Sequence, residues 1–292
     1  MIRFFKKYYP FAKAGVLNFL AYKFVVFCWL IVSILSTIVT FFVWTAVFKS
    51  YAESSGMLIN DVILNGFHYK EMISYSVIIF IASFCTMNDE TMDRMSDEIK
   101  DGSIAMQLIK PISYRIRFIF ASIGNLVSIN LIMGIPLVAI GYTTLMLLGF
   151  IEYVSVLDIV IRVLCFFLAE LVACLLIDGF NYIFGLFTFY TMASFGLFNV
   201  KNVIQNFLAG TLIPISFFAN SNIGWIRGFG RIFEFSPFVF MAQFPTYILI
   251  NRISYIEIAQ SFGIALIWIF AFELIGGLLY HHAIKNVVIQ GG

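Results

Sequence analysis

Residues 24–48 read FVVFCWLIVSILSTIVTFFVWTAVF, a stretch without a single acidic or basic side chain. A helix of about 20 apolar residues is long enough to cross the hydrocarbon core of a bilayer. Trp44 lies near the end of the run, a position typical of tryptophan at the membrane–water interface. The stretch predicts a membrane-spanning helix. It is too long for a signal peptide and lacks a small-residue cleavage site, so we expect it to stay in the chain.

The same apolar character extends over all 292 residues. Hydrophobic residues make up 61% of the chain and charged residues 12%, whereas a typical soluble domain has about 25% charged residues. A soluble chain of this size cannot bury so much apolar surface, so we expect the rest to face lipid. The net charge of +2 gives no reason to expect nucleic acid as a partner.

Further apolar runs extend the pattern along the chain. We expect an all-α, polytopic membrane protein with about six transmembrane helices, forming a single domain over residues 1–292. The expected spans cover residues 24–48, 72–88, 118–148, 159–190, 195–218 and 257–282.

The lysines and arginines predict the orientation, because loops on the cytoplasmic side carry an excess of them. With the N-terminus inside, 12 basic residues lie inside and 6 outside. We therefore expect both termini in the cytoplasm, which agrees with an even number of spans. The outer set is Lys49, Lys70, Arg162, Arg227, Arg231 and Arg252.

The N-terminal segment, residues 1–22, is basic and aromatic, and it contains Lys6, Lys7 and Lys13. Pro10 is expected to break it. From Phe11 onward the apolar residues recur at helical spacing, which favours an amphipathic helix lying on the membrane face. The alternative is a disordered basic tail.

Residues 89–117 form a strongly charged segment between the second and third spans. Charges of both signs recur there at three- and four-residue intervals, as on a solvated helix. Gly102 suits a helix C-cap and Ser103 the N-cap of a second, short helix, which Pro111 ends. The segment is either an ordinary connecting loop or a docking element for a soluble partner.

Residues 207–256 are too apolar for a plain loop, and glycines and prolines interrupt them, beginning with Gly210 and Pro214. This pattern predicts short re-entrant or interfacial helices. Such irregular backbone persists at membrane depth only where protein or a cavity covers it.

Three carboxylates fall inside the expected spans: Glu170 and Asp178 in the fourth and Glu273 in the sixth. Intramembrane charges are costly, so they mark either a substrate or proton path or an interhelical hydrogen bond; an error in the span boundaries is a further alternative. The sequence contains no HExxH, no GxSxG and no phosphate-binding loop. We therefore do not expect an enzyme, and active transport would need an ion gradient or a separate ATPase.

Several segments match one family in order and spacing. They are NFLAYK (18–23) before the first span, EIKDGSIAMQLIKPIS (98–113), LAGTLIPISFF (208–218), SPF (236–238) with PTY (245–247), and VIQGG (288–292). With these segments the chain resembles the permease subunits of bacterial ABC transporters of the type-2, exporter-like class. It departs from the family pattern at Lys110, where arginine is usual, and around Ala219 and Asn220, where a proline is usual.

The resemblance implies a subunit of the bacterial cell membrane that pairs with a second permease, identical or paralogous. Two cytoplasmic ATP-binding subunits would dock on residues 1–22 and 89–117, and would bind ATP and magnesium, so this chain itself needs no cofactor. Their closure would switch the path between inward- and outward-facing states. The docking residues carried over are Glu98, Asp101, Gly102, Ser103, Ile104, Leu108, Lys110 and Pro111.

The apolar interior favours a hydrophobic or amphipathic substrate, such as a lipid, a peptide or a drug-like molecule. The main alternative function is an ion-coupled secondary transporter that uses the three intramembrane carboxylates, although no internal repeat supports it. An intramembrane enzyme with His68 or His281 as base, or a scaffold subunit, are the remaining alternatives.

Overall fold

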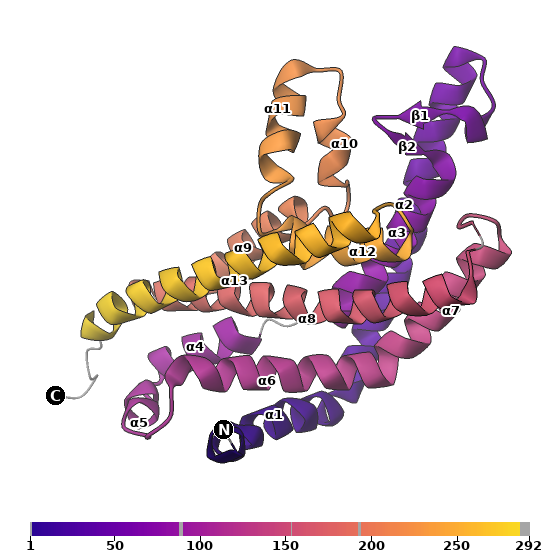
Figure 1. The fold of residues 1–292 in the computed structure, drawn as a ribbon. Helices are drawn as coiled ribbons and strands as arrows, with labels where there is room; N and C mark the ends of the chain where they lie inside the picture. The colour runs from indigo at the N-terminus through magenta and orange to yellow at the C-terminus, as the bar shows by residue number, and fades with distance from the viewer. Residues whose placement is uncertain (1, 88–89, 153, 192–193, 287–292) are drawn as a thin grey trace.

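The computed structural model describes residues 2–87, 90–152, 154–191 and 194–286. Figure 1 shows that this part of the chain is built from helices. The only strands within it are β1 (Ile63–Leu64) and β2 (Phe67–His68), which pair as a small antiparallel hairpin. The predicted all-α fold is confirmed. Asp89, at the start of the charged segment, and the C-terminal VIQGG lie outside the described residues.

Five stretches of described residues are long and apolar enough to cross a membrane, which confirms a polytopic membrane protein. The first, fourth and fifth are single helices, whereas the second and third are each built from consecutive helices. In chain order they contain α2 (Lys23–Ser55), α3 (Tyr69–Cys85) with α4 (Glu90–Lys100), α6 (Tyr114–Ile129) with the π-helix η2 (Asn130–Gly134) and α7 (Ile135–Leu147), α8 (Val156–Phe187), and α13 (Tyr255–Ala283).

The span expected at residues 195–218 is divided in the structure. α9 (Ser194–Leu208) has 15 residues and is therefore about 22 Å long, shorter than the roughly 30 Å of a hydrocarbon core. Gly210 follows in a turn with a φ of +78°, and α10 (Ile215–Ala219) begins after Pro214. Apolar composition continues through this turn, so the sequence pattern merged two helices into one span.

Short helices precede the last span, as predicted. α10 and α11 (Gly224–Phe233) form a helical hairpin that stands away from the body in Figure 1. The 3₁₀ turn η3 (Val239–Met241) leads into α12 (Gln243–Leu249), and every residue of α12 is buried. α12 packs against α3 and α8, so protein covers this irregular part of the backbone.

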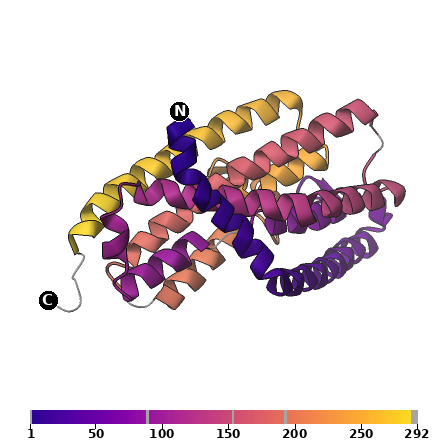
Figure 2. The same cartoon turned by 90° about the horizontal axis from the view of Figure 1, so that it is seen from below.

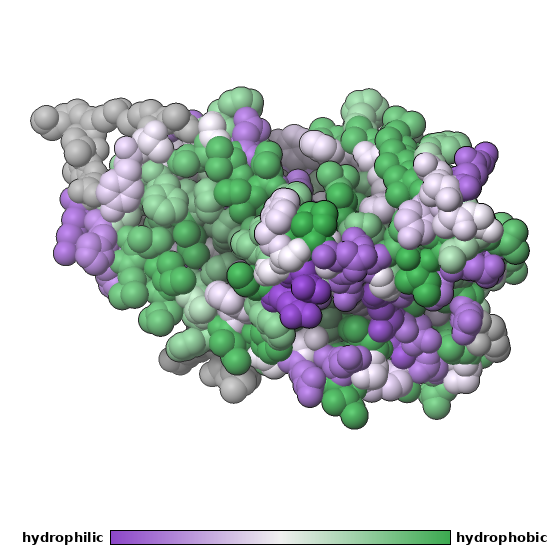
Figure 3. All heavy atoms as spheres, turned by 90° about the horizontal axis from the view of Figure 1, so that it is seen from above, coloured by the Kyte–Doolittle hydropathy of each residue, from purple (hydrophilic) through white to green (hydrophobic). Residues whose placement is uncertain are grey.

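α8 lies at the centre of the molecule, with α13 on one side and α6 on the other (Figure 1). Its buried side chains, together with those of α3 and α12, form half of the main hydrophobic core. α2 lies at the rim and leaves most of its apolar side chains exposed. Figure 3 shows hydrophobic side chains exposed over much of one face, as expected for a surface that contacts lipid.

The bundle has two distinct ends. One, here called the α5 end, carries the end of α4, α5 (Ile104–Leu108), the start of α6 and the end of α13 with its 3₁₀ turn η4 (Ile284–Asn286). The other, the β-hairpin end, carries the 3₁₀ turn η1 (Ile59–Asp61) and the β1–β2 hairpin. Arg252 stabilises the β-hairpin end, because its guanidinium binds Glu71 and donates to the carbonyl of Gly66.

The N-terminal segment forms one helix, α1 (Ile2–Ala21), so the expectation that Pro10 breaks it is wrong. Figure 2 shows α1 crossing α6 at a steep angle before the chain enters α2. The residues buried in this crossing include Tyr8, Gly15 and Phe19. Packing on α6 holds the helix together despite the hydrogen bond that the proline cannot donate.

Candidate functional site

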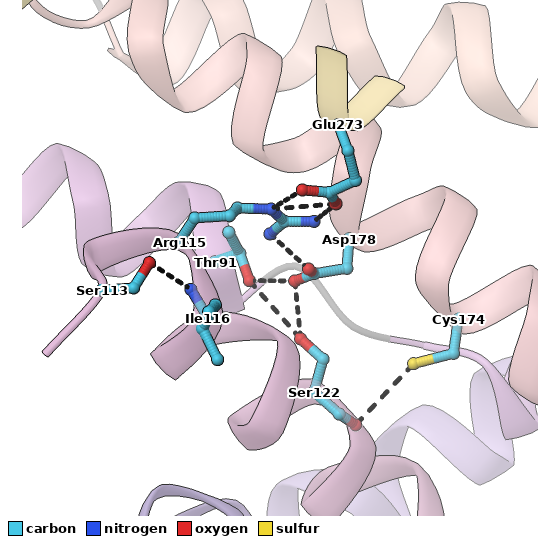
Figure 4. A network of polar contacts seen from close by, with 8 residues as sticks. All are labelled: Thr91, Ser113, Arg115, Ile116, Ser122, Cys174, Asp178 and Glu273. Atoms are coloured by element: carbon cyan, nitrogen blue, oxygen red, sulfur yellow. Dashed lines mark hydrogen bonds and ion pairs between the residues drawn. The ribbon is translucent and has the colours of Figure 1, made fainter. Parts of the chain in front are cut away.

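The start of α6 places an arginine among three other helices. Ser113 caps α6, since its hydroxyl oxygen accepts a hydrogen bond from the backbone N–H of Ile116 at 3.4 Å. This cap fixes the first turn, so that the side chain of Arg115 reaches toward α8 and α13 (Figure 4).

Arg115 binds two carboxylates at once. Its Nη1 lies 2.5 Å from Oδ2 of Asp178 on α8, and its Nη2 lies 2.5 Å from Oε1 of Glu273 on α13. Its Nε donates to both oxygens of Glu273 at 3.1 Å. The rigid fork of the guanidinium suits the binding of two carboxylates at once. Arg115 therefore joins the start of α6 to two long helices, α8 and α13, which pack on each other.

The second oxygen of Asp178 is also occupied. Oδ1 accepts hydrogen bonds from the hydroxyl of Thr91 on α4 at 2.5 Å and from that of Ser122 on α6 at 2.6 Å. The side chain of Asp178 is 0% exposed, so these donors replace the water that it loses on burial. We call Thr91, Arg115, Ser122, Asp178 and Glu273 the arginine cluster; it connects four helices (Figure 4).

This arrangement bears on the carboxylates that the sequence places inside the spans. Asp178 and Glu273 both form interhelical ion pairs, which favours the structural alternative over a free proton path for these two. In the sequence, Arg115 is one of the charges of segment 89–117, and its pairing with the intramembrane carboxylates was not predicted. The available signal was an arginine at the start of an apolar helix in a chain with three intramembrane acids that have no evident partner in the sequence.

Glu170 differs from the other two carboxylates. It is fully buried in α8, and neither of its oxygens has a hydrogen-bond partner among the described residues. A charged carboxylate without a partner is very costly in such a place, so the physical chemistry favours the neutral acid.

We predict that Glu170→Gln changes the thermal midpoint of the solubilised protein little, by an amount equivalent to less than about 1 kcal/mol. The amide keeps the shape of the neutral acid, and no ion pair is lost. Asp178→Asn in the same assay is expected to destabilise the protein clearly, because it weakens the pairing with Arg115. Equal losses for the two variants would contradict the assignment of Glu170 as an uncharged, unpaired group.

Glu98, at the end of α4, points into the molecule. Its Oε2 accepts a hydrogen bond from the phenol of Tyr114 at 2.9 Å and forms an ion pair with Arg117. The guanidinium of Arg117 in turn lies over the rings of Tyr114 and Phe118. Glu98 therefore fastens α4 to α6, and its carboxylate is already engaged.

The predicted helix–turn–helix of residues 89–117 is present as α4, a turn and α5. Gly102 has a φ of +74°, the left-handed conformation that glycine adopts most easily. The hydroxyl of Ser103 does not cap α5; instead Oδ1 of Asp101 accepts the backbone N–H of Ser103 at 2.8 Å. Hydrogen bonds from the Ser103 hydroxyl and backbone lower the pKa of Asp101, which keeps this surface carboxylate charged at neutral pH.

The two sides of α5 differ sharply. Ile104 is 2% exposed and packs with Met95 and Tyr114, whereas Met106 is 64% exposed and Ile109 78% exposed. Asp101, Gly102, Lys110 and Pro111 are exposed beside them; the side chain of Leu108 lies outside the described residues. The apolar surface of this tip is therefore formed by Met106 and Ile109, which are not among the docking residues predicted from the sequence.

α1 is joined to this region through α6. The backbone N–H of Ser113 donates to the phenol oxygen of Tyr8 at 2.9 Å, and the Tyr8 ring stacks on Phe120 with centroids 5.4 Å apart. Farther along, Gly15 and Gly124 let the two backbones approach closely. Lys6, Lys7 and Lys13 are exposed. Both segments predicted to dock an ATPase thus rest on one helix.

Gly210 and Pro214 lie apart from the α5 end, in the turn after α9. The carbonyl of Gly210 accepts a hydrogen bond from the phenol of Tyr75 at 2.6 Å. After Pro214, the backbone N–H of Ile215 donates to Oε1 of Gln243 at 2.7 Å. These bonds tie the turn to α3 and α12, which positions the hairpin of α10 and α11.

Among the described residues, no group of three or more histidine, cysteine, aspartate or glutamate side chains could hold a metal ion. No curated protein and no solved structure matches the chain. A family model described as "ABC-2 family transporter protein" matches residues 57–291, which is most of the chain and includes both the α4–α5 tip and the arginine cluster. The chain therefore belongs to the ABC-2 family of transporter proteins.

Proposed function

We propose that this chain is the transmembrane subunit of an ATP-driven exporter and that the α5 end is its ATPase-docking face. The observation that carries this proposal is the single mechanical unit at that end. α5 is anchored by Ile104, which packs on Met95 of α4 and Tyr114 of α6. α1 packs along α6, and α6 is joined through Arg115 to α8 and α13.

Because these helices are joined, a movement at the α5 end could be transmitted to the central helices. ATP-binding subunits that close beneath the tip would push on Met106 and Ile109, and α6 would pass that movement to the two central helices. Rigid shifts of packed helices are an established way to switch between two states. Magnesium and ATP would reside in the partner subunits, since the sequence contains no phosphate-binding loop.

The wider assembly follows the same proposal. A second permease, identical or paralogous, completes the path, and the substrate is a hydrophobic or amphipathic molecule moved outward. The excess of basic residues at the α5 end supports a cytoplasmic position for both termini, in a bacterial cell membrane. An ion-coupled transporter is less favoured, because two of its three candidate carboxylates are held by Arg115.

The decisive test is co-purification of an ATP-binding subunit from mildly solubilised native membranes, for the natural chain and for Ile109→Asp. A charge at this exposed apolar tip should remove a central contact, worth about 2 kcal/mol or more at an interface hot spot, and reduce the bound ATPase more than tenfold. The fold should be unaffected, because the Ile109 side chain packs little on its own protein.

Leu58→Asp is the matched control, since Leu58 is 74% exposed in the loop at the opposite end. It should retain the ATPase. Glu98 is unsuitable for this test, because reversal of its charge would break the contacts with Tyr114 and Arg117. Retention of the ATPase by Ile109→Asp would contradict the assigned docking face, and a lack of any ATPase under mild conditions would contradict the function itself.

A further inference from the structure

A cavity of about 530 Å³ lies between α2, α3 and α9, separate from the arginine cluster. Its volume falls within the roughly 300–1,000 Å³ typical of small-molecule sites. Aromatic rings from all three helices line it, among them Trp29, Phe80 and Phe198. The flat or branched apolar part of a ligand could therefore pack against these rings.

Polar side chains meet in this cavity although the helices that carry them are otherwise apolar. On α2 and α3 the hydroxyl residues follow each other three positions apart, and on α9 the amide residues do the same, so each helix presents one polar stripe. The polar lining consists of Ser33 and Ser36 on α2, Ser83 and Thr86 at the end of α3, Asn202, Gln205 and Asn206 on α9, and Thr211 in the turn after α9.

The described residues that line the cavity include no acidic or basic side chain. Two of its polar atoms, the hydroxyl oxygen of Ser83 and Oε1 of Gln205, are buried without a hydrogen-bond partner in the described part of the chain. A buried acceptor that lacks a donor is costly. A ligand that brings donors to this wall would remove that cost once the two side chains rotate toward it.

We propose that this cavity binds the uncharged head of an amphipathic molecule, a head that carries hydroxyl or amide hydrogen-bond donors. An anion would find no basic partner among the described residues of the wall, and a cation no acidic one. A purely apolar ligand would leave the hydroxyl of Ser83 and the Oε1 of Gln205 without a hydrogen-bond partner. The inference rests on the proposed export function, because it narrows the substrate class from amphipathic molecules to uncharged ones with donor groups.

The test uses the full chain in phosphatidylcholine nanodiscs, without ATP or any partner, so that its result is separate from the ATPase test. Four probes share one dibrominated fatty acyl chain and differ in the head: a glycerol ester, a glycinamide, a methyl ester and a choline ester. Bromine quenches tryptophan fluorescence, and the signal from Trp29 is the difference between the natural chain and Trp29→Phe.

We expect saturable quenching by the glycerol ester or the glycinamide at lower concentration than by the methyl or choline ester. Whichever of these two probes binds more tightly shows whether the natural ligand's head carries hydroxyl donors or amide donors. Ser83→Ala with Gln205→Leu should weaken that binding about tenfold, and the weak quenching by the methyl ester should stay unchanged, which shows that the cavity is intact.

Ser54→Ala with Gln260→Leu is the matched control, because both residues are exposed and lie outside the cavity. It should bind as the natural chain does. The proposal is overturned if the choline ester binds as tightly as the donor-bearing probes, if no probe saturates, or if the cavity variant behaves like the control.

Discussion

Arg115→Met is expected to lower the stability of the folded protein by about 3–5 kcal/mol, the usual cost of breaking a buried ion pair from one side. The loss arises from Asp178, whose side chain is 0% exposed and would lose its counter-ion. Thr91 and Ser122 would still donate to it, but neutral donors compensate a buried charge only in part. The thermal midpoint of the detergent-solubilised protein, followed by size-exclusion chromatography, measures the effect.

Two further variants separate charge from geometry. Arg115→Lys should recover only part of the loss, because a point charge cannot reach two carboxylates in the forked manner of the guanidinium. Arg115→Met combined with Asp178→Asn and Glu273→Gln should be clearly more stable than Arg115→Met alone, since no unpaired charge then remains.

Arg231→Met is the matched control, because Arg231 is exposed on α11, and surface charges contribute at most about 1 kcal/mol. If Arg115→Met behaved like this control, or if the neutral triple variant were no better than the single one, the arginine cluster would not be the bond that holds α6 to α8 and α13.

The sequence predicted the class of fold because a membrane restricts the choices. Residues 24–48 can satisfy their backbone inside lipid only as a helix, and Gly102 marks its turn by local conformation alone. The arginine cluster could not be predicted in this way. Arg115 is 63 residues from Asp178 and 158 from Glu273 along the chain, and no local pattern encodes which intramembrane acid meets which base.

Which residues of α5 are exposed could not be predicted from the sequence either. A helix of five residues is too short for a hydrophobic period to show which side is buried. The apolar run from Ile104 to Ile109 therefore gave no reason to separate its first isoleucine, which is buried, from its last, which is exposed. Only the packing of α5 on α4 and α6 decides which residue is available to a partner.

Gly124→Val is expected to detach α1 from α6. A Cβ atom on Gly124 would lie 2.0 Å from the carbonyl oxygen of Ala12, and one on Gly15 would lie 2.3 Å from that of Ala121. Both obstacles are backbone atoms and cannot rotate away, so the helices must separate. Such overpacking usually costs about 1–3 kcal/mol, and we expect the upper part of that range here.

The consequence should be confined to the α1 side of the molecule. Separation would break the hydrogen bond between Tyr8 and Ser113 and the stacking of Tyr8 on Phe120. Arg115 points to the other side of α6, toward α8 and α13 (Figure 4), and should keep its contacts. Hydrogen–deuterium exchange in nanodiscs should therefore rise at least tenfold in α1 and remain unchanged in α8.

Gly263→Val in α13 is the matched control, since a Cβ atom there would meet nothing within 4 Å and the change in helix propensity is the same. It should leave exchange in α1 unaltered.

Under the proposed function, Gly124→Val should also weaken the response of the partner ATPase to substrate, even though the α5 tip is intact, because one of the two docked segments no longer moves with α6. Faster exchange in α1 with full ATPase coupling would show instead that α5 transmits the movement alone. Unchanged exchange in α1 would contradict the close crossing of the two helices.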